Sequence, residues 1–128
     1  MKSERGDPLV ITLSGLPPSV WVAYGQRMRS PGKFMKAPAR EWRDGAVDEA
    51  RCQYKRKPIE GRLEVYVEFL IKSRGRWDID NRCKILLDAL TMAGVWVDDS
   101  QIDFLAIKIM VNGKQKEIKT IVRIKEVS

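Results

Sequence analysis

The run RLEVYVEFLI at residues 62–71, followed by IDNRCKILLDALTMAG at residues 79–94, decides the fold. In the first run, large apolar residues alternate with others, which is the period of a half-buried strand. In the second run, apolar residues recur at helical spacing, and Gly94 stands where a left-handed C-terminal cap is expected. We therefore expect a strand that leads into a helix of about four turns.

Two further elements precede this central pair. Residues 9–13 are a short β-rich apolar run that ends in a glycine–proline loop at residues 15–18, and we expect a buried strand there. Residues 19–38 contain glycines, prolines and basic residues without a clear period, which indicates a long basic loop. Pro38 is then suited to begin an amphipathic helix. Four residues recur at every fourth position of it: Trp42, Ala46, Ala50 and Tyr54.

Two strand-like runs, at residues 102–111 and 118–124, end the chain. Asn112-Gly113 between them is a strong signal for a short hairpin. The expected order is strand, helix, strand, helix, strand, strand. We predict an α+β fold in which two main helices pack on a small mixed sheet of about four strands.

Length and composition narrow the class of protein. The 128 residues with 44% apolar content suit one core, so we expect a single domain over residues 1–128, with residues 1–7 a flexible N-terminus. The net charge of +7 favours a polyanionic partner such as nucleic acid, although many small proteins are basic for solubility alone. No apolar run is long enough to span a membrane, and no signal-type apolar block follows the charged residues 1–7, so we expect a cytoplasmic protein without a membrane partner.

The rare residue types exclude several chemistries. The chain contains no histidine, which excludes His-ligated zinc sites and Ser-His-Asp triads. Cys52 and Cys83 are its two cysteines, and because each falls in a helical pattern we expect buried, reduced thiols. Carboxylates, lysines, hydroxyls and a hard metal remain for catalysis.

Two aspartates and a lysine stand where the central strand gives way to the helix. Asp78 and Asp80 are two residues apart and project to the same side in extended chain. Lys84 follows Asp80 by one helical turn. As the alternative, one aspartate can be a helix N-cap and Asp80 with Lys84 a surface ion pair. A role as helix caps explains less well than a functional site why these acids directly follow a basic group made of Lys72, Arg74 and Arg76.

A second acidic group, Asp98-Asp99, lies in the loop after the helix. This loop could curl an aspartate towards Asp78 and Asp80, although acidic loop residues are usually only solvated. The spacing after Asp78 excludes an EF-hand, since the required glycine and the distant glutamate are missing. From the residues alone, a site shared by all three aspartates stays open.

The combination of these motifs resembles the RusA family of Holliday junction resolvases. The resemblance rests on the segments Asp78-Ile79-Asp80-Asn81-x-x-Lys84, Leu87-Asp88-Ala89-Leu90, Ala93-Gly94-Val95-Trp96 and Asp98-Asp99-Ser100-Gln101-Ile102. It covers about 25 consecutive residues and extends weakly to Leu16-Pro17-Pro18-Ser19 and Tyr24.

The resemblance implies a Mg²⁺-dependent endonuclease, with Mn²⁺ as a substitute, that resolves four-way DNA junctions as a homodimer. It implies that Asp78, Asp80 and Asp99 hold the metal and that Lys84 is the accompanying catalytic lysine. Asp98 is either a further ligand or a loop cap, and Asn81 is expected to orient a ligand by a hydrogen bond. We interpret Asp88 as an i+4 partner of Lys84.

Basic residues near these motifs are candidates for gripping DNA, and each can instead be solvated surface. They are Arg27, Arg29, Lys33 and Lys36 in the long loop, Arg51, Lys55, Arg56 and Lys57 after it, and Lys72, Arg74 and Arg76 beside the acids. Trp21 stands where the family typically has Asn, which places junction recognition by this loop in doubt. A base-stacking role and simple packing are both open for Trp21.

Two other functions compete with junction resolution. One is a non-catalytic, basic DNA-binding protein in which the aspartates serve as caps. The other is a metal-dependent nuclease acting on flaps or other branched DNA, because a carboxylate cluster specifies hydrolysis more than DNA shape.

Overall fold

A computed structural model describes residues 8–18, 37–73 and 79–127 of the chain. The predicted flexible N-terminus and nearly all of the predicted basic loop lie outside these ranges. In chain order the elements are β1 (Leu9–Ser14), α2 (Ala37–Gln53), β2 (Arg62–Ile71), α3 (Ile79–Met92), the 3-10 helix η2 (Asp99–Gln101), β3 (Ile102–Val111) and β4 (Lys119–Val127). The α+β class, the element order and the four-stranded mixed sheet are therefore as predicted.

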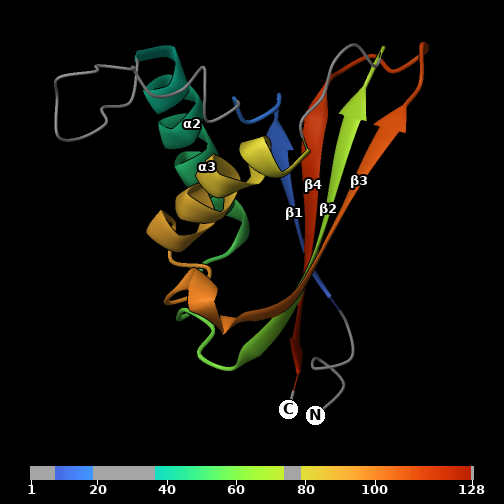
Figure 1. The fold of residues 1–128 in the computed structure, drawn as a ribbon. Coiled ribbons are helices and arrows are strands. Elements are labelled where there is room, and N and C mark those ends of the chain that lie inside the picture. Colours follow the sequence, from blue (N-terminus) through green and yellow to red (C-terminus); the bar gives the residue numbers. More distant parts are fainter. Residues whose placement is uncertain (1–7, 19–36, 74–78, 128) are drawn as a thin grey trace, which may run out of the picture.

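The strands of the sheet follow the order β1-β4-β2-β3. β2 pairs in parallel with β3 on one side and antiparallel with β4 on the other, and β1 pairs antiparallel with β4. A parallel pair needs a crossover connection, and α3 provides it by running back across the sheet between β2 and β3. Figure 1 shows α2 and α3 on the same side of the sheet.

The predicted hairpin at Asn112-Gly113 is wrong. β3 and β4 are consecutive in sequence but β2 lies between them, so the connection crosses the end of β2. The Asn112 N–H donates to the Ile71 carbonyl at 3.0 Å, which prolongs the pairing of β2 with β3 by one residue. The turn signal is local, whereas strand order depends on which partner buries the apolar faces best.

The core lies between the sheet and the two helices. β2 contributes alternate residues that are almost fully buried, as its pattern predicts, while β1 is an edge strand of which only Ile11 and Leu13 are buried. α3 contributes Leu86 and Leu90, and α2 contributes Ala46 and Ala50, all buried. The other face of the sheet carries no helix among the described residues.

The end of α3 is built as its sequence predicts. Gly94 has φ +85°, and the Val95 N–H donates to the Leu90 carbonyl at 3.1 Å, which closes the last turn. Trp96 follows, is 1% exposed and donates from Nε1 to the Thr91 hydroxyl at 2.6 Å. These bonds fix where the chain leaves the helix towards η2.

Both cysteines are free thiols, but only Cys83 is buried. The expectation that Cys52 is buried is wrong, because this residue lies on the exposed side of the last turn of α2. No helix in the described parts of the chain combines the length and the apolar character needed to cross a membrane.

Candidate active site

The start of α3 carries the first group of predicted site residues. Asp80 and Asn81 fall in its first turn, although nothing is described of their side chains. Lys84 lies one turn further and is exposed. Asp78 lies outside the described residues, as do Arg74 and Arg76. Lys72, the remaining member of that basic group, follows β2 and is exposed.

Arg82 joins this end of α3 to the loop after β1. Its Nη1 donates to the Pro17 carbonyl at 2.9 Å. Burial of the guanidinium lowers the pKa of Arg82, because the charged form loses solvation. The two separate parts of the family motif, Leu16-Pro17-Pro18 and the Asp80–Lys84 helix start, are therefore adjacent in space.

The second acidic group is built on η2, at the opposite end of α3. Asp98 is the N-cap of η2, and its carboxylate accepts a hydrogen bond from the Ser100 hydroxyl at 2.6 Å. The side chain of Asp98 is thus tied to a residue of the same turn. Asp99 is exposed, and among the described residues no hydrogen bond or ion pair reaches its carboxylate. Of the two exposed acids, Asp99 is thus the one whose carboxylate has no partner among the described residues.

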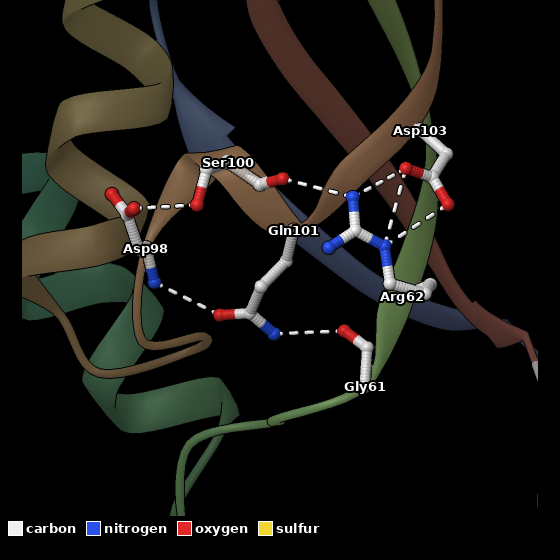
Figure 2. A network of polar contacts seen from close by, with 6 residues as sticks. All are labelled: Gly61, Arg62, Asp98, Ser100, Gln101 and Asp103. Atoms are coloured by element: carbon white, nitrogen blue, oxygen red, sulfur yellow. Dashed lines mark hydrogen bonds and ion pairs between the residues drawn. The ribbon is translucent and has the colours of Figure 1, made fainter.

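Gln101 fixes this turn in place. It is 8% exposed, and its Oε1 accepts from the main-chain N–H groups of Val97 and Asp98, each at 2.9 Å. Its Nε2 donates to the carbonyls of Ile59 and Gly61, each at 2.8 Å. Figure 2 shows the amide of Gln101 between Asp98 and Gly61. One side chain thus ties η2 to the segment that enters β2.

Arg62 holds the same turn from its other side. Its guanidinium donates to the Ser100 carbonyl at 3.0 Å and, from Nε, to Asp103 Oδ2 at 3.1 Å (Figure 2). The hydrogen bond from Arg62 lowers the pKa of Asp103, and the same bond raises the pKa of Arg62. Both side chains are about half exposed, so we expect the pair to fix the position of the η2 turn more than to stabilise the fold.

Within one chain, α3 separates the two acidic groups. The helix has 14 residues, which corresponds to roughly 20 Å at 1.5 Å per residue. Asp80 lies in its first turn, and Asp98 and Asp99 follow its last. Figure 1 shows η2 below the far end of α3, away from its first turn. The structure therefore does not bring Asp99 to Asp80 in a single chain. Among the described side chains, no cluster of three potential metal ligands occurs.

One further prediction about charged residues has an outcome, and the proposed DNA contacts stay predictions. The ion pair expected between Lys84 and Asp88 does not form, because no nitrogen–oxygen distance of 4.0 Å or less joins them. Arg51 donates to the Met92 carbonyl at 3.3 Å and so links α2 to the end of α3. The exposed residues Lys55, Arg56 and Lys57 follow it. Four residues lie outside the described ranges: Arg27, Arg29, Lys33 and Lys36. Trp21 lies outside them too.

Sequence reasoning missed Gln101 and Arg62 as parts of the site. The bonds that join them across the site, from Arg62 to Ser100 and from Gln101 to Ile59 and Gly61, link residues about 40 apart in sequence, which no local pattern reveals. One signal was present, since an Asp followed three residues later by Gln is a form of the capping box. Asp98 and Gln101 have this spacing.

Comparison with known proteins agrees with these motifs. The family model described as "Endodeoxyribonuclease RusA" matches residues 21–125. A protein of Aquifex aeolicus named crossover junction endodeoxyribonuclease RusA is 33% identical over 86 residues, which are 66% of this chain and 68% of that protein. Proteins of the same name from Escherichia coli K12 and Enterobacteria phage 82 are 40% identical over 50 residues, 38% of this chain and 42% of each relative. In these two the match spans less than half of the relative's length. Because the family model covers most of the sequence, the chain belongs to the RusA family of endodeoxyribonucleases.

Proposed function

We propose that this protein is a Mg²⁺-dependent endonuclease that resolves four-way DNA junctions by paired, symmetric nicks in recombination and repair. The observation that carries the proposal is the RusA family match over residues 21–125. The structure supports it with an exposed carboxylate, Asp99, on a turn that side-chain hydrogen bonds fix on both sides. The net charge of +7 suits a polyanionic substrate.

We assign Asp78, Asp80 and Asp99 as the metal ligands. Three carboxylates are a donor set that suits a hard cation such as Mg²⁺, or Mn²⁺ in its place. When bound, the cation would polarise the scissile phosphate and supply activated water for in-line attack. Lys84, exposed one turn after Asp80, would offset negative charge that develops on the phosphate, and Asn81 would orient a neighbouring carboxylate. Asp98 stays a possible further ligand, because the bond from Ser100 occupies only one of its two carboxylate oxygens.

The length of α3 supports a homodimer. Asp99 cannot share a metal with Asp80 of its own chain while a 14-residue helix separates them. A second copy related by a two-fold axis can supply the missing carboxylate, with two equivalent sites in each dimer. Two sites related by a two-fold axis also match a four-way junction, in which two symmetric strands must be cut.

For DNA binding we propose the basic residues named above, most of which lie outside the described ranges. Of the three beside the acids, Lys72 is the one that the structure describes, and it is exposed just after β2, at the end of the sheet that leads to Asp78. Its ammonium group would contact phosphate beside the cut site and fix the position of the strand.

We further propose that residues 1–128 work as one domain in the cytoplasm of a bacterial or phage-infected cell. The single sheet supports one domain, because β1 near the start of the chain pairs with β4 near its end. DNA junctions form in that compartment.

The test is cleavage of a synthetic four-way junction, a flap and a plain duplex, each with Mg²⁺ or EDTA. We expect symmetric nicks in the junction only, and only with metal. Asp99→Asn should lower the rate by at least roughly a hundredfold, since even an outer partner of a metal ligand is worth ten- to a hundredfold. The matched control is Asp88→Asn on α3, whose carboxylate forms no ion pair, and it should cleave normally.

Three outcomes would each reject the proposal in a different way. Equal cutting of the flap would favour a nuclease for other branched DNA. Junction binding without any product under any divalent metal would favour the non-catalytic reading. Full activity of Asp99→Asn would remove that residue from the metal site.

A further inference from the structure

The face of the sheet that points away from α2 and α3 presents two aromatic rings (Figure 1). Along β2, the residues between the buried positions point to this open face, and Tyr66 among them is 40% exposed. Tyr66 pairs with Ala106 of β3, so Phe104, two residues earlier in β3, lies on the same face, and it is 47% exposed. The ring centres are 5.4 Å apart, and the ring planes are inclined by 51°. Two exposed rings from neighbouring strands therefore stand side by side.

Further apolar side chains extend this ring pair across the open face. Val10 of β1 is 45% exposed, and Met110 of β3 is 37% exposed. Leu70 and Ile121, on the two strands between them, are half-buried on the same face. Soluble proteins rarely expose a contiguous apolar surface unless something binds to it. The open face is therefore a candidate binding surface.

The charged side chains beside the rings are mainly cations. By the register of the strands, four cations and two carboxylates share the part of the open face that residues 64–70 of β2 span: Lys108, Lys119, Arg123, Lys125, Glu64 and Glu68. One carboxylate is already paired, because Arg123 Nη1 donates to Glu68 Oε1 at 2.7 Å. Lys108 and Lys125 are exposed, and no ion pair within the described part of the chain reaches either of them. This charge distribution favours an anionic partner.

Exposed rings with cations beside them fit an unpaired DNA strand better than another protein surface. Unpaired bases stack on aromatic side chains, whereas the bases of a duplex are stacked on one another and do not reach the rings. Lysine and arginine side chains beside the rings attract the phosphates of the same strand. A second copy of the chain docked through this face would instead bring two positive surfaces together, which repel each other. The chain belongs to a family of endodeoxyribonucleases, so the nucleic acid is DNA.

We propose that the open face of the sheet binds single-stranded DNA, with one base stacked on Tyr66 and a second base stacked on Phe104. Lys108 of β3 and Lys125 of β4 contact phosphates beside the stacked bases. This inference goes beyond the proposed function, because it concerns an unpaired strand and involves neither the three aspartates nor a metal ion. A single-stranded segment held on this face would keep the protein on DNA that has lost its base pairing.

The first test measures binding of a fluorescent thymidine oligomer of about 15 nucleotides by anisotropy, in EDTA so that nothing is cleaved. A Tyr66→Leu/Phe104→Leu double variant should bind at least about twentyfold more weakly, because apolar surface remains but stacking on a ring is lost at two positions. The matched control is Val10→Leu, an apolar substitution on the same face that removes no ring, and its affinity should be unchanged. Circular dichroism must show that all variants are folded. A wild type that does not bind at roughly 0.1 mM, or a double variant that binds like the wild type, would overturn the proposal.

A duplex of the same length separates base stacking from simple attraction to phosphate. The Tyr66→Leu/Phe104→Leu variant should bind this duplex as tightly as the wild type does, because paired bases do not reach the rings. An equal loss of affinity for the duplex and for the single strand would overturn the stacking. Tighter binding of a uridine RNA oligomer than of the thymidine oligomer would overturn the choice of DNA.

The second test follows the phosphate contacts through their salt dependence. In a Lys108→Gln/Lys125→Gln double variant, the slope of log affinity for the thymidine oligomer against log salt should fall by about 1.4, since each phosphate contact on a single strand contributes about 0.7. An unchanged slope would remove both lysines from the binding surface and overturn the proposal.

Two further outcomes separate this inference from its alternatives. If the Tyr66→Leu/Phe104→Leu variant dissociates an oligomer in sedimentation velocity while it still binds the thymidine oligomer normally, the open face is an interface between copies and the proposal is rejected. A wild type that binds the oligomer in EDTA through these rings, but cuts no junction with Mg²⁺, would reject the proposed function and leave this inference standing.

Discussion

Gln101→Met is the substitution that most sharply tests how η2 is fixed. Methionine is similar in length but forms none of the four hydrogen bonds that Gln101 makes with the main chain at 2.8–2.9 Å. Each such bond is worth about 0.5–1.5 kcal/mol net, and the groups left behind are partly reachable by water. We therefore expect a loss of about 2–4 kcal/mol in the free energy of unfolding, or roughly 8–15 °C in Tm.

The assay is urea unfolding of Gln101→Met beside Gln115→Met. Gln115 donates a single bond, to the Glu117 carbonyl at 2.8 Å in the connection before β4, so its loss should cost less than about 1 kcal/mol. Below the transition, Gln101→Met should also cleave junctions more slowly at unchanged affinity, because Asp99 is no longer held in position. Equal stability of the two variants would refute the reasoning.

Three other predictions follow from single features. The hydrogen bond from Arg62 lowers the pKa of Asp103 in the folded protein. The stability that the pair adds is therefore fully present above the pKa of Asp103 in the unfolded chain, about 3.9, and is lost as pH falls through its folded pKa. The gap in urea midpoint between wild type and Asp103→Asn should therefore shrink from pH 7 to pH 3, and a constant gap would contradict this. Gly94→Ala should lower the free energy of unfolding by about 1 kcal/mol through backbone strain alone, since φ is +85° and no atom lies within 4 Å of the added Cβ. An unchanged urea midpoint in this variant would contradict that strain. Junction affinity, measured by fluorescence anisotropy, should fall steeply with salt, and a flat response would reject the phosphate contacts.

The elements of the fold could be predicted because their signals are local. The alternating apolar residues Leu63, Val65 and Phe69, all 0% exposed, predict the alternate burial along β2. Gly94, with its positive φ, predicts the end of α3. Strand order could not be predicted in this way. Asn112-Gly113 favours a hairpin locally, but the crossover through α3 lets β3 pair with β2, and β4 must then pair on the other side.

The candidate site likewise combines features that have a local sequence signal with features that have none. Asp80 and Lys84 share a helix turn, which spacing alone reveals. Asp99 could be joined to them only through the family resemblance, and the length of α3 is the observation behind our proposal that a second chain supplies it. Gln101 and Arg62 escaped prediction because the bonds by which they join η2 to the start of β2 link residues that are remote in sequence.

The most direct test of the central claim, a metal site shared between two copies, mixes two inactive variants. Asp80→Asn and Asp99→Asn should each fail to nick a four-way junction in Mg²⁺. In a mixed dimer formed by joint refolding, one site carries both substitutions and the other carries neither. We predict that the mixture recovers nicking of one strand per junction. If each site were instead built within one chain, both sites of the mixed dimer would be defective, and a mixture as inactive as its components would contradict the account.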